Sequence, residues 1–233
     1  MSMHKVLFWD FDGTLVFPNE AYSIALDRAL RVYGYEIPFD EIRRCTRVIP
    51  WHTHQTIYPH PAGDAWWEVL QGRMTPFFAE WQVPEAVYEE VFCRYREELN
   101  RYEYRLFDDA LDTMEMCRKM GYECHLLSNN HPDLPQILER MGLRERFGIL
   151  VIGSLFGYDK PRTELFRYAM AEAGEPEEAW MIGDNPECDI KGAKEAGLRT
   201  IWVGHRWGQE TGERYADAIV DSLSEIPAIL EQK

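Results

Sequence analysis

The stretch Val6-Leu-Phe-Trp-Asp10-Phe-Asp12-Gly13-Thr14 lies near the start of the 233-residue chain and joins an apolar run to a polar turn. An uninterrupted apolar run of this length, closed by Asp-Gly-Thr, predicts a short buried strand. Asp10 and Asp12 therefore stand directly past the carboxyl end of that strand. The rest of the chain decides which other side chains lie beside them.

Strands and helices alternate along the chain after Phe107. Apolar runs predict strands over residues 124–127, 149–152, 179–182, 200–203 and 218–220. Helical patterns between these runs predict helices that each stop before a glycine, at Met120, Met141, Ala173 and Ala196. Elements that alternate in this way predict an α/β fold, in which helices cover both faces of a Rossmann-like parallel sheet.

Residues 17–105 differ from the chain on either side of them. They show helical periodicity and turn signals but no convincing strand. Asn19 is placed to cap a helix that stops at Gly34, and residues 65–81 and 84–104 predict two long helices rich in aromatic side chains. We therefore predict an α/β core formed by residues 1–16 and 106–233, with residues 17–105 inserted after the first strand as a mainly helical cap.

Composition narrows the classes of partner and the cellular location. The chain carries 25 Lys and Arg against 40 Asp and Glu, a formal net charge of −15. This charge disfavours nucleic acid and anionic membranes as partners. The five cysteines are scattered without a Cys-x-x-Cys pair, which argues against a disulfide framework or a zinc site. We find neither a signal peptide nor a membrane-spanning run, and we expect a cytoplasmic protein.

Polar residues gather past the carboxyl ends of several predicted strands. They are Asp10, Asp12, Ser128, Asn129, Lys160, Asp184 and Asp189. In open parallel sheets these ends form the ligand crevice. Carboxylates crowded together repel one another unless a cation lies between them, and oxygen donors without His or Cys favour Mg²⁺. A carboxylate beside Mg²⁺ can attack phosphorus, while a second acid protonates the leaving oxygen and later deprotonates water.

The same residues resemble the four motifs of the haloacid dehalogenase superfamily. Asp10-Phe-Asp12-Gly13-Thr14 resembles the first motif, Ser128-Asn129 the second, Lys160-Pro161 the third and Gly183-Asp184-Asn-Pro-Glu-Cys-Asp189 the fourth. They occur in the right order and in the expected strand-to-loop context. The helical insert after the first motif is similar to the cap of the phosphoglycolate phosphatase-like subgroup. The resemblance thus covers the whole predicted core.

The resemblance implies a role for each motif residue. It makes Asp10 the nucleophile and a metal ligand, and Asp12 the general acid/base whose backbone carbonyl also contacts the metal. It assigns Ser128 and Asn129 to phosphoryl binding, Thr14 to orienting Asp12, and Lys160 to neutralising charge beside Asp10. Asp184 is implied as a direct Mg²⁺ ligand. Asp189 is implied as a ligand that acts through water or as a partner of Lys160.

The resulting prediction is an Mg²⁺-dependent phosphatase that forms an aspartyl-phosphate on Asp10. Its substrate would be a small phosphorylated metabolite, such as a sugar phosphate, phosphoglycolate or a nucleoside monophosphate. A phosphomutase using the same site, or a catalytically silent binding protein of this fold, remain the alternatives. The dehalogenases of the superfamily lack the second acid of the first motif, so Asp12 favours phosphoryl transfer. We expect a monomer or a homodimer.

Other features of the sequence have simpler explanations. Taken singly, the motif acids could be turn or helix-capping residues. His52, His54 and His60 are poorly spaced for a transition-metal site. We expect the remaining conspicuous side chains to form a solvated helix face (Arg43, Arg44 and Arg47), the core of the cap (Trp51, Trp66, Trp67 and Trp81) and a packing contact (Cys188).

Overall fold

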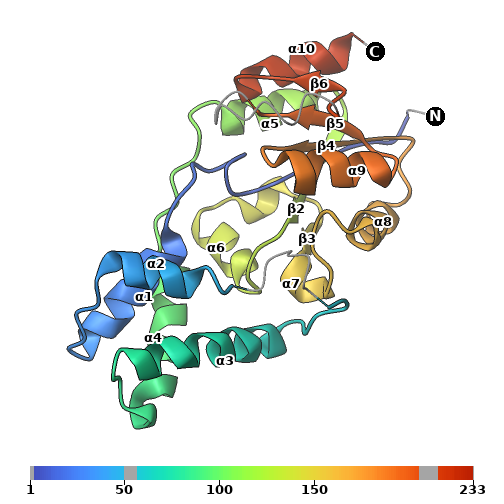
Figure 1. Cartoon of the computed structure of the whole chain (residues 1–233). Helices are drawn as coiled ribbons and strands as arrows, with labels where there is room; N and C mark the ends of the chain where they lie inside the picture. The colour runs from blue at the N-terminus through green and yellow to red at the C-terminus, as the bar shows by residue number, and fades with distance from the viewer. Residues whose placement is uncertain (1–2, 50–56, 205–214, 233) are drawn as a thin grey trace.

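The structure is a computed structural model, and it describes residues 3–49, 57–204 and 215–232. Its centre is a parallel sheet of six strands in the order β3-β2-β1-β4-β5-β6 (Figure 1). The strands are β1 (Lys5–Trp9), β2 (Tyr122–Ser128), β3 (Leu150–Ile152), β4 (Glu178–Gly183), β5 (Arg199–Trp202) and β6 (Ala218–Ile219). The α/β fold predicted from the sequence is confirmed.

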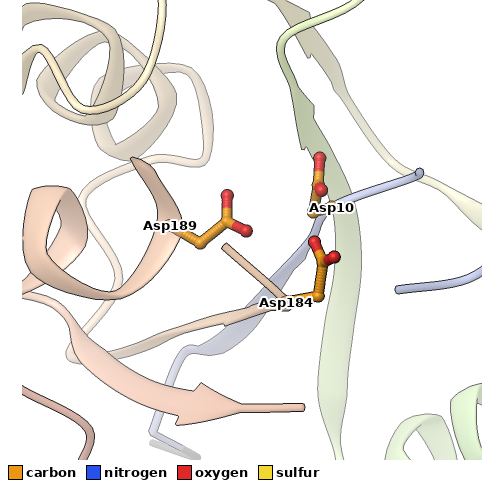
Figure 2. Close-up of side chains that lie close together, drawn as sticks. All are labelled: Asp10, Asp184 and Asp189. Carbon is orange, nitrogen blue, oxygen red and sulfur yellow. The ribbon is translucent and has the colours of Figure 1, made fainter. Parts of the chain in front are cut away.

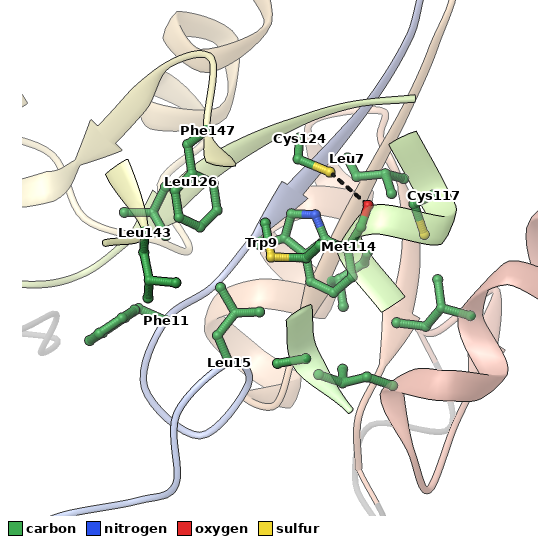
Figure 3. Packing of buried hydrophobic residues seen from close by; sticks show 14 of the residues in the cluster. Leu7, Trp9, Phe11, Leu15, Met114, Cys117, Cys124, Leu126, Leu143 and Phe147 are labelled. Atoms are coloured by element: carbon green, nitrogen blue, oxygen red, sulfur yellow. Dashed lines mark hydrogen bonds between the residues drawn. The ribbon is translucent and has the colours of Figure 1, made fainter. Parts of the chain in front are cut away.

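Strand β1 lies in the middle of the sheet and is buried on both faces. Leu7 and Trp9 point into one apolar layer, and Figure 3 shows them with Met114 and Cys117 of α5 (Ala110–Lys119). The same layer includes side chains of α6 (Leu134–Arg140) and α10 (Ile226–Glu231). Val6 and Phe8 point into the opposite layer, against α8 (Thr163–Glu172) and α9 (Gly192–Glu195). This double burial explains why β1 is continuously apolar from Val6 to Trp9.

Short elements complete the core. They are η2 (Arg144–Arg146), α7 (Gly153–Phe156), η3 (Pro186–Lys191) and η6 (Leu223–Glu225). The sequence predicted one helix after Asp184. The structure instead has a π-helical turn, η3, followed by the short helix α9. Asn185 begins this turn, because its side chain accepts hydrogen bonds from the N–H groups of Glu187 and Cys188.

The predicted cap contains the helices coloured blue to green at the lower left of Figure 1, and it has an apolar core separate from those that flank the sheet. Its elements are α1 (Ala21–Val32), α2 (Phe39–Thr46), α3 (Asp64–Glu80), η1 (Glu85–Val87) and α4 (Tyr88–Asn100). Trp66 and Trp67 are buried in this core and Trp81 packs against it, as predicted. Trp51 lies outside the described residues.

One helix of the cap is shorter than predicted. Residues 84–104 were expected to form a single helix, but the 3₁₀ turn η1 precedes α4, which ends at Asn100. Val87 separates the two elements, because its backbone angles of φ −112° and ψ 4° are not those of an α-helix. Side-chain periodicity does not reveal such a break, because the order of polar and apolar residues does not report the backbone angles of a single residue.

The two chain crossings between cap and core lie side by side. Val16 and Leu106 form an isolated antiparallel bridge. The N–H of Phe17 donates to the carbonyl of Arg105 at 2.9 Å, and the N–H of Phe107 donates to the carbonyl of Leu15 at 3.0 Å. The structure thus brings the two predicted ends of the cap together. The domain limits themselves stay a prediction.

The basic cluster of the cap is a network of exposed ion pairs. Arg43 contacts Glu20 and Asp40, and Arg44 contacts Glu41 and Glu80. For these two arginines the predicted solvated helix face is confirmed, and Arg47 is also exposed. Among the described helices, none combines the length and apolar character that crossing a bilayer requires.

Candidate active site

A cavity of about 460 Å³ opens past the carboxyl ends of β1, β2 and β4. It is lined by Asp10, Asp12, Gly13, Pro18, Asn19, Tyr22, Ser128, Asn129, Lys160, Asp184, Asn185, Cys188 and Asp189. All the motif residues predicted from the sequence except Thr14 are therefore brought to one place. Pro18, Asn19 and Tyr22 come from the start of the predicted cap, so both parts of the molecule contribute to the cavity.

Three carboxylates converge on one point of the cavity. Asp10 follows β1, Asp184 follows β4, and Asp189 projects from η3 toward both of them (Figure 2). One oxygen of each lies within 4.8 Å of the others. Gly13 permits this approach: it has φ +78°, and a Cβ there would lie 2.2 Å from Oδ2 of Asp184. The glycine of the first motif therefore serves both the turn and the close packing on Asp184.

Lys160 is the cation that faces this cluster. Its Nζ lies 2.7 Å from Oδ1 of Asp10 and 2.6 Å from Oδ1 of Asp189, and it donates to the carbonyl of Leu127 at 2.9 Å. Burial by itself lowers the pKa of this ammonium group, but the two carboxylates raise it above its ordinary value. Lys160 therefore stays charged and bridges the predicted nucleophile and Asp189.

One ammonium group does not balance the carboxylates around it. Burial raises the pKa of Asp184 to about 8, and the charges of Asp189 and Asp10 add to the effect. Burial likewise raises the pKa of Asp189 to about 6, although Lys160 opposes it. A cluster of carboxylate oxygens that resists ionisation in this way fits a hard divalent cation such as Mg²⁺. Asp10 and Asp184 would be the donors for it.

Asp189 differs from those two acids in having both oxygens engaged within the protein. Oδ1 faces Lys160, and Oδ2 accepts a hydrogen bond from the N–H of Asn185 at 2.9 Å. Gly183 makes room for it, since a Cβ there would lie 2.3 Å from the Asp189 carboxylate. Of the two roles that the sequence left open, this geometry favours the partner of Lys160.

Asp12 is held by two asparagine side chains, one on each oxygen. Nδ2 of Asn19 donates to Oδ1 at 2.8 Å, and Nδ2 of Asn130 donates to Oδ2 at 2.8 Å. Although Asp12 is partly exposed to the cavity, burial in the surrounding protein raises its pKa to about 6. A carboxyl group that titrates near neutral pH suits a residue that must both give and take a proton.

These two asparagines were not predicted as site residues. Asn19 was expected only to cap a helix, and its Oδ1 does accept the N–H of Ala21 at 3.0 Å. Asn130 directly follows the second motif, but its role depends on reaching a residue 118 positions away. The contacts of Asn19 and Asn130 with Asp12 cannot be predicted from the local sequence pattern.

Asn129 has a more specific place than predicted. Its Nδ2 donates to the carbonyl of Lys160 at 2.8 Å, and its Oδ1 accepts the N–H of Lys160 at 2.7 Å. Asn129 therefore fixes the backbone that carries the lysine. Ser128 ends β2 and lines the cavity beside it. Their predicted contact with a phosphoryl group stays a prediction.

Thr14 is fully buried, and among the described residues its hydroxyl has no hydrogen-bond partner. Its predicted role in orienting Asp12 also stays a prediction. Cys188 lines the cavity, but burial raises the pKa of its thiol to about 12, so it is not a thiolate at neutral pH. His60 is buried outside the cavity, 3.3 Å from Asp159, while His52 and His54 lie outside the described residues.

Comparison with known proteins identifies the family of the chain. The family model of haloacid dehalogenase-like hydrolases matches residues 4–197. The chain is 31% identical to the phosphoserine phosphatase of Thermus thermophilus, over 95% of this chain and 97% of that protein. It is 25% identical to the glyceraldehyde 3-phosphate phosphatase of Pyrococcus furiosus, over 100% of this chain and 95% of that protein.

A solved structure shows the same fold. The hydrolase YfnB of Bacillus subtilis, determined with bound magnesium, superposes with a TM-score of 0.72 over 98% of this chain and 99% of its own. The two sequences are 21% identical, so this likeness bears on the fold alone. Because the family model spans most of the chain, the chain belongs to the haloacid dehalogenase-like hydrolase family.

Proposed function

We propose that this hydrolase is an Mg²⁺-dependent phosphatase that releases phosphate from a small phosphomonoester through an aspartyl-phosphate on Asp10. The observation that carries the proposal is the arrangement around Asp10. Lys160 contacts the Asp10 carboxylate at 2.7 Å, one oxygen of Asp184 lies within 4.8 Å of one oxygen of Asp10, and Asp12 is held in the same cavity by two asparagines. This supplies a nucleophile, a charge partner and an acid/base in one cavity.

In the first step an Asp10 carboxylate oxygen forms a bond to phosphorus, and the bond from phosphorus to the leaving oxygen breaks. Asp12, in its protonated form, gives its proton to that departing oxygen. Lys160 offsets the negative charge at Asp10 while the phosphoryl group moves. A bound Mg²⁺, held by Asp10, Asp184 and the backbone carbonyl of Asp12, would neutralise charge on the transferring group.

In the second step Asp12, now a carboxylate, takes a proton from a water molecule. The water oxygen forms a bond to phosphorus, and the bond from phosphorus to the Asp10 oxygen breaks. Inorganic phosphate leaves, and both acids return to their starting forms. The pKa of about 6 at Asp12 supports this proposal, because both protonation states are populated near neutral pH.

The size of the cavity supports a small substrate. About 460 Å³ accommodates a metabolite but not a folded macromolecule, and residues of the cap line one side of it. Two relatives are named phosphoserine phosphatase and glyceraldehyde 3-phosphate phosphatase, and both names are consistent with a small phosphomonoester as substrate. We also propose a cytoplasmic location, since the described cysteines are all free thiols.

The test is phosphate release from a panel of small phosphomonoesters, measured with Mg²⁺ and with a chelator. We expect turnover only with the metal, and a loss of about 10³-fold or more in Asp10→Asn, because the nucleophile is then absent. Undiminished turnover in Asp10→Asn would exclude the mechanism. Turnover that requires a bisphosphate activator and returns a phosphorylated isomer would identify a phosphomutase instead.

A further inference from the structure

The loop between β2 and α6 contacts both the proposed active site and the cap. It runs from Asn129 to Asp133, and its first two residues hold Lys160 and Asp12, as described above. Its last residue, Asp133, is buried against the cap helix α4. Five consecutive residues therefore join the general acid of the core to a helix of the cap.

On the core side, the loop fixes the orientation of the Asn130 amide. Its Oδ1 accepts the N–H of His131 at 2.8 Å and the hydroxyl of Tyr22 at 3.4 Å. With the oxygen occupied by donors, the amide nitrogen is the group that faces Asp12. Asn130 is almost fully buried, with 1% of its surface exposed, so it has little freedom to turn away.

On the cap side, Arg96 of α4 binds Asp133 at the other end of the loop. Its Nε and one terminal nitrogen contact the two oxygens of Asp133 at 2.5 and 2.6 Å. Asn100, one turn further along α4, donates to Oδ2 of Asp133 at 2.9 Å. The guanidinium carbon of Arg96 also lies 4.9 Å from the ring centre of Trp67, on α3. The cap helix α4 thus binds one core carboxylate through a bidentate arginine, and that arginine packs on α3.

His131 links the two ends of the loop. Its Nδ1 accepts the N–H of Asp133 at 3.3 Å, and its ring packs against two cap side chains, Tyr22 at 5.7 Å and Trp67 at 5.3 Å between ring centres. Burial lowers the pKa of His131 to about 3, so the ring is neutral and packs as an apolar group. Asp133 and Asn130 are therefore joined by a short segment that is buried throughout.

We propose that Arg96 is a positioning residue for catalysis. By anchoring Asp133 to the cap, it fixes the 129–133 loop and so keeps Asn130 on the Asp12 carboxyl group that protonates the leaving oxygen. This inference rests on the proposed function, because it requires Asp12 to act as the general acid. It adds that the cap contributes to the chemical step and not only to enclosing the substrate.

The experiment compares two substrates that differ in their need for a general acid. An aryl phosphate such as para-nitrophenyl phosphate has a leaving group that departs without a proton, whereas an alkyl phosphomonoester needs one. We measure kcat/KM for both substrates in the wild type and in Arg96→Ala, and we compare the ratio of the alkyl value to the aryl value between the two proteins. General acid catalysis contributes about 10²- to 10⁴-fold, so its partial loss is expected to lower this ratio about tenfold. The ratio does not depend on the fraction of the preparation that is folded.

Three variants test the route by which Arg96 acts. Asn130→Ala removes the direct contact with Asp12 and is expected to lower the ratio at least as much as Arg96→Ala. In Arg96→Ala combined with Asn130→Ala, the ratio is expected to fall little further, because both substitutions disturb the same group. Full additivity of the two effects would overturn the proposal. Arg96→Lys keeps the charge but loses the bidentate contact, and it is expected to restore the ratio only in part.

The matched control is Arg101→Ala. Arg101 belongs to the end of the same helix region but pairs with Glu97 and Glu98 of α4 rather than with the core. We expect its ratio to match the wild type. An unchanged ratio in Arg96→Ala, or equal losses on both substrates, would refute the positioning role while leaving the phosphatase intact. Wild type that releases phosphate from neither substrate would instead refute the proposed function.

Discussion

Replacing Lys160 with Met should reveal how much the stability of the buried acids depends on this ammonium partner. Lys160 is 2% exposed and lies within 2.7 Å of both Asp10 and Asp189. Removing one member of a buried ion pair costs about 3–5 kcal/mol, because the remaining charge is left without compensation. Met fills a similar volume, so a packing defect adds little to this cost.

The stability lost on this replacement should depend on pH, because the acids left without Lys160 can take up protons. Asp184 and Asp189 have folded pKa values of about 8 and about 6. These lie above the unfolded value near 3.9. Folding therefore binds protons between pH 4 and 8, and stability falls as pH rises through that range. We expect Lys160→Met to lose about 3 kcal/mol or more at pH 8 and about half as much at pH 5.

Urea unfolding followed by tryptophan fluorescence, in the presence of a chelator, measures this loss at pH 5, 6.5 and 8. Lys119→Met is the matched control, because its side chain is 73% exposed and pairs only loosely with Glu115 at 3.7 Å. Surface pairs of this kind contribute little, so we expect no measurable change there. A loss below about 1 kcal/mol for Lys160→Met, or one that is constant across this pH range, would refute the electrostatic account.

Three further predictions concern the same cavity. At a fixed metal concentration, Mg²⁺ should raise the melting temperature of the wild type much more than that of Asp184→Asn, which thermal unfolding measures. Equal shifts would exclude Asp184 as a metal ligand. Gly13→Ala should abolish Mg²⁺ binding measured by calorimetry, because its Cβ would overlap the Asp184 carboxylate at a backbone angle of φ +78°; wild-type affinity would contradict this. Asn129→Ala should lower kcat about tenfold with little change in KM, because the Lys160 backbone loses the two hydrogen bonds that Asn129 makes to it. Steady-state kinetics measures both constants, and a change in KM alone would contradict this prediction.

The parts of the site that follow from strand ends could be predicted from the sequence. Asp10 and Asp184 each come directly after an apolar run, and parallel strands bring their carboxyl ends to one edge of the sheet. Lys160 was assigned its role by resemblance to a motif, and the structure places its Nζ 2.7 Å from Oδ1 of Asp10. In each case a local pattern and one rule of topology were sufficient.

The parts that depend on contacts between distant segments could not be predicted. Asn130 reaches Asp12 across 118 positions, and Arg96 reaches Asp133 across 37. An asparagine after a strand and an arginine on a helix are both common surface residues. Only the packing of the cap against the loop after β2 gives these residues their roles. The break at Val87 was missed for a similar reason, because it changes backbone angles without changing the apolar pattern.

The most direct test of the central claim is to trap the phosphoryl group on the enzyme. A single turnover with para-nitrophenyl phosphate and Mg²⁺ is quenched in acid, and the peptides are analysed by mass spectrometry. We predict one phosphoryl group on the peptide that contains Asp10, with greater accumulation in Asp12→Asn because the second step then lacks its base. Phosphate release by the wild type with no labelled peptide in either protein, or with the label on another residue, would contradict the account.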